Sequence, residues 1–367
     1  MGSVKDLLFT EPAYENRPGA GSFVFSDRYS VFDWGEMPDH IAGKGRALAA
    51  MAAYHFEELE RQGIRTHYQG LVGPRGKLMR FDDLKENGGG VETMQVKLAR
   101  VYHPVAREFL LGDGVTIEYD YSFFAANRGR LNNYLIGLEI IFRNGLPLGS
   151  SVFKRIEQAR DGVDEREGRR RVAAILRELG LREPPVPGQM LPRPVMSFTT
   201  KLEPGDRALR EREALVISGL RSRDFAELKR VALKSNDIVT DLARKGGFEH
   251  YDGKIEAVWD SGIVVCDVLG TFDENRFAFQ GQQLSKEVLR QWYKRHQPEF
   301  VEACDRWKKT GRGWQERCDV KPRKLPKELA LLASQMYMAG SNHYTGRKIF
   351  KAPPLPQVLE SLQRFTS

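Results

Sequence analysis

The sequence predicts an α+β protein, because its first third is rich in strands and its later part combines strands with helices. Residues 1–135 are typical of strands and turns interrupted by one clear helix, and an apolar strand follows at residues 136–142. Two strand-like segments between residues 254 and 268 flank the turn Ser261-Gly262 and indicate a β-hairpin. Beyond residue 285 the pattern is mainly helical.

The clearest helix is predicted from near Gly45 to Gln62, where apolar residues recur at helical spacing until Gly63 ends the pattern. A proline-rich stretch at residues 184–194 is interpreted as an extended connection. The chain is expected to finish in a tail that contains three prolines. The other predicted helices lie at about residues 162–180, 225–245, 285–307 and 326–338.

Length and composition are those of a soluble globular protein. The 367 residues suffice for two or three domains' worth of core, and 41% hydrophobic and 29% charged residues are ordinary values. The N-terminus has no basic-then-apolar signal, and no run approaches the roughly 18 apolar residues of a membrane span. Cys266, Cys304 and Cys318 are spaced unlike a zinc motif. They fit a reducing compartment, so we expect a cytoplasmic protein without a membrane partner.

The net charge of +8 and the pI near 9.3 permit binding to nucleic acid or to anionic small molecules. The basic residues are spread along the chain and mixed with acidic ones. The densest run, Arg169-Arg170-Arg171, follows the acidic stretch 164–167 and is typical of a solvated helix face. Composition alone leaves both partner classes open, although phosphorylated metabolites are the more economical use of the charge.

Glu256 and Asp267 are predicted to face each other across the hairpin. If Asp260 pairs with Ile263, the ladder places the two carboxylates directly opposite each other on one face. Like charges in that position repel, and a metal ion between them would reverse the effect. The alternative is a solvated hairpin with charges on its outer face. A one-residue slip in the turn would also separate the carboxylates onto opposite faces.

Two further stretches are suited to binding an anion. Residues 26–33 precede Gly43-Lys44-Gly45, whose backbone amides at a helix N-terminus could hold a negative group. At residues 139–155 a strand delivers Arg143, and a Gly-Ser turn then offers amides, a hydroxyl and two cations, which suits a phosphate. Each stretch could also be an ordinary loop with exposed basic residues.

Taken in order along the chain, these stretches resemble the phosphoribosylaminoimidazole-succinocarboxamide synthase (SAICAR synthetase) family. The resemblance covers roughly residues 2–295. Departures include Gly137 where the family usually has proline, and Val268 where a glutamate usually follows the metal-binding aspartate. The similar motifs are residues 2–7, 26–33, Gly43-Lys44-Gly45, 63–67, 139–144, 149–155, Asp252-x-Lys254-x-Glu256, Asp267 and 273–277.

The resemblance implies a two-lobed α+β fold with ATP in the cleft between the lobes. Residues 1–135 would form a small N-terminal lobe with an antiparallel sheet, and residues 136–300 a larger α/β lobe that binds ATP and substrate. Residues 301–367 would add a helical C-terminal extension.

The implied activity is that of an ATP-dependent ligase in de novo purine biosynthesis. The enzyme would join carboxyaminoimidazole ribonucleotide (CAIR) to L-aspartate, giving SAICAR, ADP and phosphate. A carboxylate is a poor electrophile, so ATP would first convert it to an acyl phosphate that the amine then attacks. In phosphoryl transfer the protein mainly positions the reacting groups and neutralises the charge on the phosphates. ATP and Mg²⁺ are therefore the expected cofactors.

The resemblance also implies roles for individual residues. Glu256 and Asp267 would hold Mg²⁺ against the ATP phosphates. Lys5 would cover the triphosphate, and the strand around Glu139 would border the adenine. Three residues would bind the ribonucleotide phosphate: Arg143, Ser150 and Arg276. Three more would serve catalysis: Asp252; Lys254, near the transferred phosphate or the substrate carboxylate; and Asp273, near the aspartate or imidazole amine. The motifs supply further candidates: Asp27, Ser30, Asp33, Lys44, Lys154 and Arg155.

Two alternatives remain open at this point. A paralogue that amidates a related carboxylated ribonucleotide would keep the same ATP, metal and phosphate sites. A non-catalytic, basic nucleotide-binding module would leave the pairing of Glu256 with Asp267 unexplained. The expected partners are the ribonucleotide and L-aspartate, with no nucleic acid, and a homo-oligomer is left open.

Overall fold

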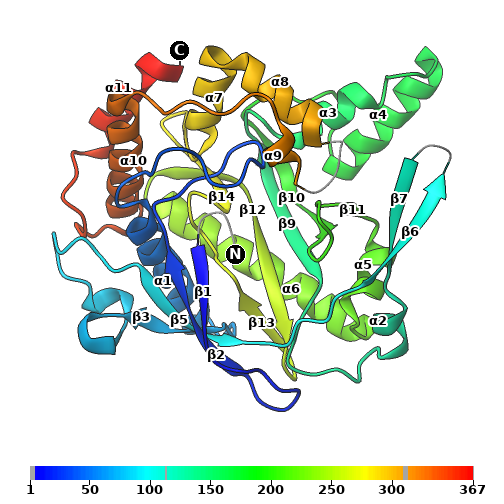
Figure 1. The fold of residues 1–367 in the computed structure, drawn as a ribbon, viewed down its shortest axis with the longest axis horizontal. Coiled ribbons are helices and arrows are strands. Elements are labelled where there is room, and N and C mark those ends of the chain that lie inside the picture. The colour runs from blue at the N-terminus through cyan, green and yellow to red at the C-terminus, as the bar shows by residue number, and fades with distance from the viewer. Residues whose placement is uncertain (1–4, 112–113, 309–312, 367) are drawn as a thin grey trace.

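The computed structural model describes residues 5–111, 114–308 and 313–366 (Figure 1). Residues 2–4 of the motif expected at the start of the chain lie outside the described residues, so Lys5, Asp6 and Leu7 represent that motif. No helix within the described ranges is long and apolar enough to cross a membrane.

The first sheet gathers the early strands around one helix. Within the described residues it has five strands, and each neighbouring pair is antiparallel. Helix α1 (Lys44–Arg61) begins and ends within one residue of the prediction and packs against β2, β3 and β5. The spatial order of the strands is β1 (Lys5–Glu11), β2 (Gly19–Phe25), β5 (Thr93–Leu98), β3 (Tyr68–Val72) and β4 (Leu78–Met79).

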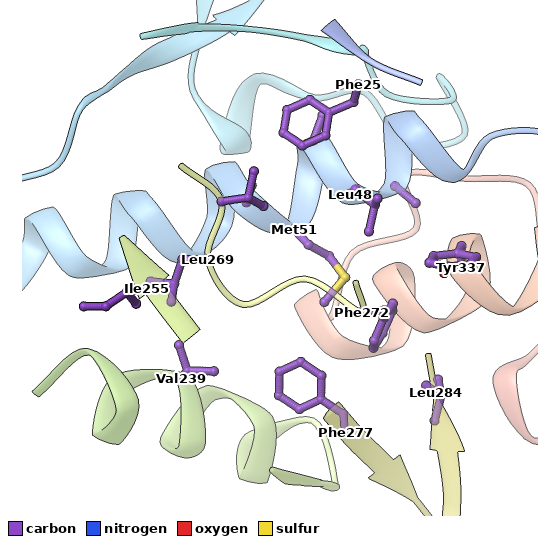
Figure 2. Packing of buried hydrophobic residues seen from close by; sticks show 14 of the residues in the cluster. Phe25, Leu48, Met51, Val239, Ile255, Leu269, Phe272, Phe277, Leu284 and Tyr337 are labelled. Atoms are coloured by element: carbon purple, nitrogen blue, oxygen red, sulfur yellow. The ribbon is translucent and has the colours of Figure 1, made fainter. Parts of the chain in front are cut away.

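The second sheet is larger and also antiparallel at each described pairing. Helix α6 (Ser222–Lys245) packs against this sheet, where Val239 lies near Ile255 and Phe277 (Figure 2). The order is β11 (Ala208–Leu209), β10 (Gln189–Thr200), β9 (Leu138–Leu146), β12 (Phe248–Trp259), β14 (Asn275–Phe279) and β15 (Gln282–Leu284), with β8 (Tyr134–Leu135) and β13 (Ile263–Cys266) paired to β12.

The remaining elements surround these two sheets (Figure 1). They are the hairpin β6 (Val105–Leu111) and β7 (Gly114–Asp120), and helices α2 (Ser122–Ala126), α3 (Ser151–Gln158), α4 (Glu165–Leu179), α5 (Glu211–Ser218), α7 (Glu287–His296), α8 (Pro298–Trp307), α9 (Trp314–Arg317), α10 (Lys327–Thr345) and α11 (Leu355–Thr366). The prediction that the chain ends in a tail was wrong, because residues 355–366 form helix α11. Proline is tolerated in the first turn of a helix, and Pro356 occupies that position.

Helix α10, in the C-terminal part of the chain, joins the core of the N-terminal part. It packs against α1, and the loop after β13 inserts Leu269 and Phe272 into the same apolar cluster (Figure 2). Gly340 permits this approach, since an added Cβ would lie 2.7 Å from a ring carbon of Phe272. The loop that follows β13 is therefore held between α1 and α10.

Three buried histidines should make the protein sensitive to acid. Burial lowers the pKa of His55 and of His67 to about 4 and that of His250 to about 3, so all three are neutral in the folded protein at pH 6. The unfolded chain takes up these protons below about pH 6.5. Stability should therefore fall as the pH drops from 6.5 towards 4, by up to about 3 kcal/mol for each histidine.

Urea unfolding at several pH values between 7 and 4.5 checks this expectation. His55→Gln should reduce the loss of unfolding free energy between these pH values. The exposed His40 serves as the control, and His40→Gln should leave the loss unchanged. An equal pH dependence in all three proteins would contradict the assignment to buried histidines.

Candidate active site

The hairpin has a different register from the one predicted. Trp259 pairs with Ile263, and Glu256 lies opposite Cys266 instead of Asp267. The loop therefore has three residues, Asp260, Ser261 and Gly262, and the carboxylate of Asp260 accepts hydrogen bonds from Arg65 and Asn132. The prediction that Asp260 pairs with Ile263 was therefore wrong, because the last pair of the ladder is one residue earlier, at Trp259.

Glu256 and Asp267 nevertheless act on each other. Asp267 follows the end of β13 with a φ of 63°, so the strand alternation does not govern its side chain. Lys201 Nζ lies 2.6 Å from Glu256 Oε1, and Lys5 Nζ lies 2.5 Å from Asp267 Oδ1. Each carboxylate of the predicted pair is therefore already beside the ammonium group of a lysine. The expectation that the two carboxylates are unpaired was wrong.

Burial and neighbouring charges shift the pKa values of the two carboxyl groups in opposite directions. Burial raises the pKa of Glu256, and the charge of Asp267 adds to that rise. Burial would also raise the pKa of Asp267, but the ammonium groups of Lys5 and Lys201 outweigh it and hold this pKa well below its usual range. Ionised Asp267 is thus favoured by its surroundings, and ionised Glu256 is opposed by them.

Strand alternation brings most of the predicted groups to one face of the second sheet, called here the ionic face. Asp252, Lys254 and Glu256 alternate along β12 and share this face. Arg143 of β9 pairs directly with Asp252, and Glu139 lies four residues earlier on the same face. The intervening Ile255 points to the opposite face, where α6 lies (Figure 2).

The ionic face carries a connected set of ion pairs. Lys254 Nζ lies 2.6 Å from Glu139 Oε1 and 3.4 Å from Glu274 Oε2. Lys201 Nζ lies 3.4 Å from the same Glu139 oxygen. Burial alone would lower the pKa of Lys254, but the charges of Glu274 and Glu139 raise it well above its usual value. The surroundings of Lys254 therefore favour its charged ammonium form.

Lys201 and Glu274 were not among the predicted site residues. Lys201 directly follows β10, and the prolines of residues 184–194 had favoured an extended connection where this strand begins. The prolines are accommodated where the register of β10 against β9 shifts between Met190 and Val195. Pairing of residues 189–200 with β9 would have placed Lys201 near Glu139, but no motif signals that pairing.

Arg143 and Arg276 form a basic group at the other end of the ionic face. Arg276 donates two hydrogen bonds to the carboxylate of Asp252, one of them 2.7 Å long. Arg143 is buried and donates to Ser197 Oγ at 2.8 Å, and its Nε has no hydrogen-bond partner among the described residues. Burial lowers the pKa of Arg143. The structure thus brings Arg143, Arg276 and Asp252 together.

Ser150 caps a helix that the sequence had suggested as a turn. Its Oγ accepts a hydrogen bond from the backbone amide of Val152 at the start of α3. Lys154 is exposed on this helix, and Arg155 forms an ion pair of 2.8 Å with Glu178. The helix start remains available as a place for an anion, but Arg155 already has a carboxylate partner.

The predicted anion site before α1 is filled by the chain itself. The amides of Gly43 and Gly45 donate to the carboxylate of Asp27, each at 3.0 Å. Asp27 is therefore a helix cap, and these amides are not available to a ligand. Ser30 is half-buried nearby in sequence, and the exposed Asp33 pairs with Lys308 at 2.9 Å.

Lys44 and Asp273 meet in a buried ion pair that the sequence could not indicate. Lys44 Nζ lies 2.7 Å from Asp273 Oδ2, and Tyr337 of α10 donates to Asp273 Oδ1 at 2.7 Å. Burial opposes ionisation of Asp273, yet the charges of Lys44 and Lys286 and the hydroxyl of Tyr337 lower its pKa. Both oxygens of Asp273 are thus engaged within the protein.

The ionic face offers few ligands to a metal ion. Within the described residues, no three His, Cys, Asp or Glu side chains are grouped so as to hold one. Glu256 and Asp267 nevertheless supply two hard oxygen donors. Mg²⁺ commonly binds through one or two carboxylates, with water and substrate phosphates completing its shell. These two residues therefore fit a magnesium ion that arrives with ATP.

Comparison with known proteins identifies the family of this chain. The sequence matches the SAICAR synthetase family over residues 4–307. A protein of Archaeoglobus fulgidus, provisionally named phosphoribosylaminoimidazole-succinocarboxamide synthase, is 42% identical over 366 residues that cover 99% of each chain. The chain belongs to the SAICAR synthetase family. The resemblance inferred from the motifs is thereby confirmed.

Solved SAICAR synthetases share the fold. The enzyme of Saccharomyces cerevisiae, determined with SAICAR bound, has 20% sequence identity and a TM-score of 0.59 over 95% of this chain and 94% of its own. A SAICAR synthetase in complex with ADP has 19% identity and a TM-score of 0.52 over 88% of this chain and 99% of its own. The predicted α+β fold is confirmed, and the family makes this chain an ATP-dependent ligase of purine biosynthesis.

Proposed function

We propose that this chain joins CAIR to L-aspartate with ATP, releasing SAICAR, ADP and phosphate, and that it does so in the cytoplasm. The observation that carries the proposal is the ionic face, where Lys201, just after β10, and lysines and carboxylates of β9 and β12 converge within 2.6–3.4 Å. Membership of the SAICAR synthetase family supports the choice of substrates. The three cysteines are free and buried, which suits a reducing compartment.

The ATP phosphates are assigned to the end of the ionic face near Lys5 and Lys201. Glu256 and Asp267 would hold Mg²⁺, which when bound neutralises charge on the phosphates. The two lysines already compensate these carboxylates and would contribute further positive charge to the triphosphate. Glu139 forms ion pairs with Lys201 and with Lys254 and so connects the phosphate end of the face to Lys254. The strand around Glu139 is still proposed to border the adenine.

The ribonucleotide phosphate is assigned to Arg143 and Arg276, with Ser150 at the start of α3. Arg143 is suited to this role because it is buried, cationic and retains a donor without a partner among the described residues. Asp252 is assigned to hold Arg276 in position. Asp273 is assigned to hold Lys44, instead of contacting an amine substrate directly.

Lys254 is placed to stabilise negative charge during the reaction. A carboxylate oxygen of CAIR attacks the γ-phosphorus of ATP, and ADP leaves. The aspartate amine then attacks the acyl carbon and phosphate leaves. Negative charge develops on oxygen in each step, and a fixed ammonium group nearby lowers the free energy of that transition state. The division into residues 1–135, 136–300 and 301–367 remains our proposal for the domains.

ADP release measured with each substrate omitted in turn tests this function. ADP should be released at the full rate only when ATP, CAIR and L-aspartate are all present. A strong preference for another carboxylated ribonucleotide over CAIR would replace the proposed substrate while retaining the ligase chemistry. Absence of ADP release with all three present would overturn the proposal.

Arg276→Ala should weaken binding of the ribonucleotide and not of ATP. Loss of one charge-assisted contact to a phosphate costs on the order of 1.5–3 kcal/mol, which is a ten- to hundredfold rise in KM for CAIR. The change also leaves Asp252 without its partner, so Arg276→Ala should be compared with the double variant that adds Asp252→Ala. Equal rises in the KM values for CAIR and ATP would contradict the assignment.

A further inference from the structure

A cluster of polar side chains lies on the face of the second sheet that α6 covers, opposite the ionic face. It is called here the His250 network, and its members are buried or half-buried. The reaction proposed above uses none of these side chains, so their presence inside the protein needs another explanation. The members are Asn144 of β9, Asn236 and Thr240 of α6, His250 of β12 and Asn275 of β14.

The amide of Asn275 determines which nitrogen of His250 carries a proton. The backbone amide of Gly270 donates to Asn275 Oδ1 at 2.9 Å, so the Nδ2 of Asn275 is the group that faces the imidazole. This Nδ2 lies 2.9 Å from His250 Nε2, which must therefore accept. The proton of the neutral ring is then on Nδ1, 2.8 Å from Thr240 Oγ1. Burial, which lowers the pKa of His250 to about 3, keeps the ring neutral.

Two asparagines extend the network from β9 to α6. Asn144 Nδ2 donates to Asn236 Oδ1 at 2.9 Å, and Asn236 Nδ2 donates to Asn144 Oδ1 at 2.8 Å. Asn144 Nδ2 also lies 3.2 Å from His250 Nδ1. Three neighbouring strands are thus joined to one another and to α6. Buried polar groups cost free energy when a hydrogen bond is lost, so the network opposes a shift of any one strand.

The two strand asparagines lie directly behind the basic group of the ionic face. Asn144 follows Arg143 along β9, and Asn275 precedes Arg276 along β14. Because successive side chains of a strand point to opposite faces, each arginine is on the ionic face when its neighbouring asparagine is in the network. The position of each guanidinium therefore depends on the backbone that the adjacent asparagine holds.

A bulge in β12 brings His250 to the same side as the asparagines. His250 lies two residues before Asp252 and would share its face in a regular strand. The register of β12 against β14 shifts between these two residues, so that His250 contacts α6 while Asp252 remains paired with Arg276. Gly253 leaves room for Asn275, since an added Cβ would lie 1.9 Å from Asn275 Nδ2. The backbone of β12 thus accommodates the network.

We propose that neutral His250 is a positioning residue for the group that binds the ribonucleotide phosphate. Through Asn275 it holds β14 against β12, and it contacts Asn144 beside Arg143, so it fixes how the two arginines converge on one anion. Displacement of a binding group by about 1 Å is enough to weaken its contacts substantially. This inference rests on the proposed function and adds a residue that acts on the substrate only through others.

His250→Phe tests the proposal, because it keeps a ring for packing against Phe277 but removes both nitrogens. The KM for CAIR should rise roughly tenfold, and the KM for ATP should change less than twofold. His250→Gln offers one donor and one acceptor and should recover part of the loss. Asn342→Leu is the matched control. It breaks two hydrogen bonds with the backbone of Phe350, outside the network, and should lower stability without changing either KM.

A double-variant cycle shows whether His250 acts through the arginines. In an Arg276→Ala background, His250→Phe should raise the KM for CAIR by a smaller factor than it does alone, because one of the groups that it positions is gone. The same factor in both backgrounds would contradict the proposal. Nitrogen-15 NMR of the histidine-labelled protein should find the proton of His250 on Nδ1, and a proton on Nε2 would contradict the network.

Thr240→Val keeps the test decisive if His250→Phe does not fold. It removes the hydroxyl that accepts from His250 Nδ1 and preserves the shape of the side chain. The KM for CAIR should then rise by a few-fold at constant KM for ATP. A normal KM for CAIR in the folded variants, or equal rises in the KM values for CAIR and ATP, would overturn the inference. Failure of the wild-type enzyme to use CAIR would instead overturn the proposed function.

Discussion

Asp267→Asn should reduce turnover by at least ~100-fold. The change keeps the shape of the side chain but removes one charge from the group proposed to hold Mg²⁺ against the ATP phosphates. It also leaves Lys5 without the carboxylate that lies 2.5 Å from its ammonium group. Positioning of the triphosphate and neutralisation of its charge should therefore suffer together.

The stability of the metal-free protein gives a second, independent readout of this pair. The pKa of Asp267 is held below its usual range, so its charge stabilises the folded protein at pH 7, and this contribution is lost only as the pH falls through the lowered pKa. Asp267→Asn should cost on the order of 1–3 kcal/mol. The pKa of Glu256 is raised, so ionised Glu256 disfavours folding, and Glu256→Gln should leave stability unchanged or increase it.

Steady-state turnover across a Mg²⁺ titration, combined with metal-free melting temperatures, measures both effects. Asp260→Asn is the matched control, because Asp260 lies in the same hairpin and its carboxylate pairs with Arg65 away from the ionic face. The control should retain its turnover. An Asp267→Asn enzyme with wild-type turnover and unchanged Mg²⁺ dependence would remove the main physical support for the proposed metal site.

Local patterns were enough to predict helix α1 and the two strands of the hairpin, but not β10 or α3. The helix predicted at 45–62 and the strands of the hairpin depend on periodicity and on glycine stops, which the sequence states directly. The register of the hairpin was predicted wrongly at Asp260, which lies in the loop and contacts Arg65 and Asn132 from distant parts of the chain. A sequence pattern that covers a few residues could not supply those contacts.

The motifs predicted many of the charged residues of the site but not the residues with which each of them pairs. Asp252, Lys254 and Glu256 were predicted together because alternation along one strand is a local property. Lys201 and Tyr337 were missed because each reaches the site from a different part of the fold. Asp27 was assigned to a binding loop, although its neighbours in space make it a helix cap. Pairing across elements, which decides whether a charge is free for a ligand, required the structure.

Lys254→Met should lower kcat by roughly 100- to 1000-fold, which is the effect of removing one preorganised electrostatic contact from a transition state. The charges of Glu274 and Glu139 keep the pKa of Lys254 well above its usual value, so the group stays charged throughout the working pH range. The KM for ATP should change little, because Lys254 is proposed to act on charge that develops during the reaction. Lys254→Arg should recover part of the rate.

The pH dependence of kcat separates this electrostatic role from proton transfer. A general base at Lys254 would give a rate that rises as the lysine loses its proton, whereas a fixed ammonium group gives no such rise below about pH 9. Lys229→Met is the control, because it breaks an ion pair of the same 2.6 Å length on the exposed side of α6. Normal turnover in Lys254→Met would show that the reaction does not use this charge, even though Glu139 and Glu274 converge on it.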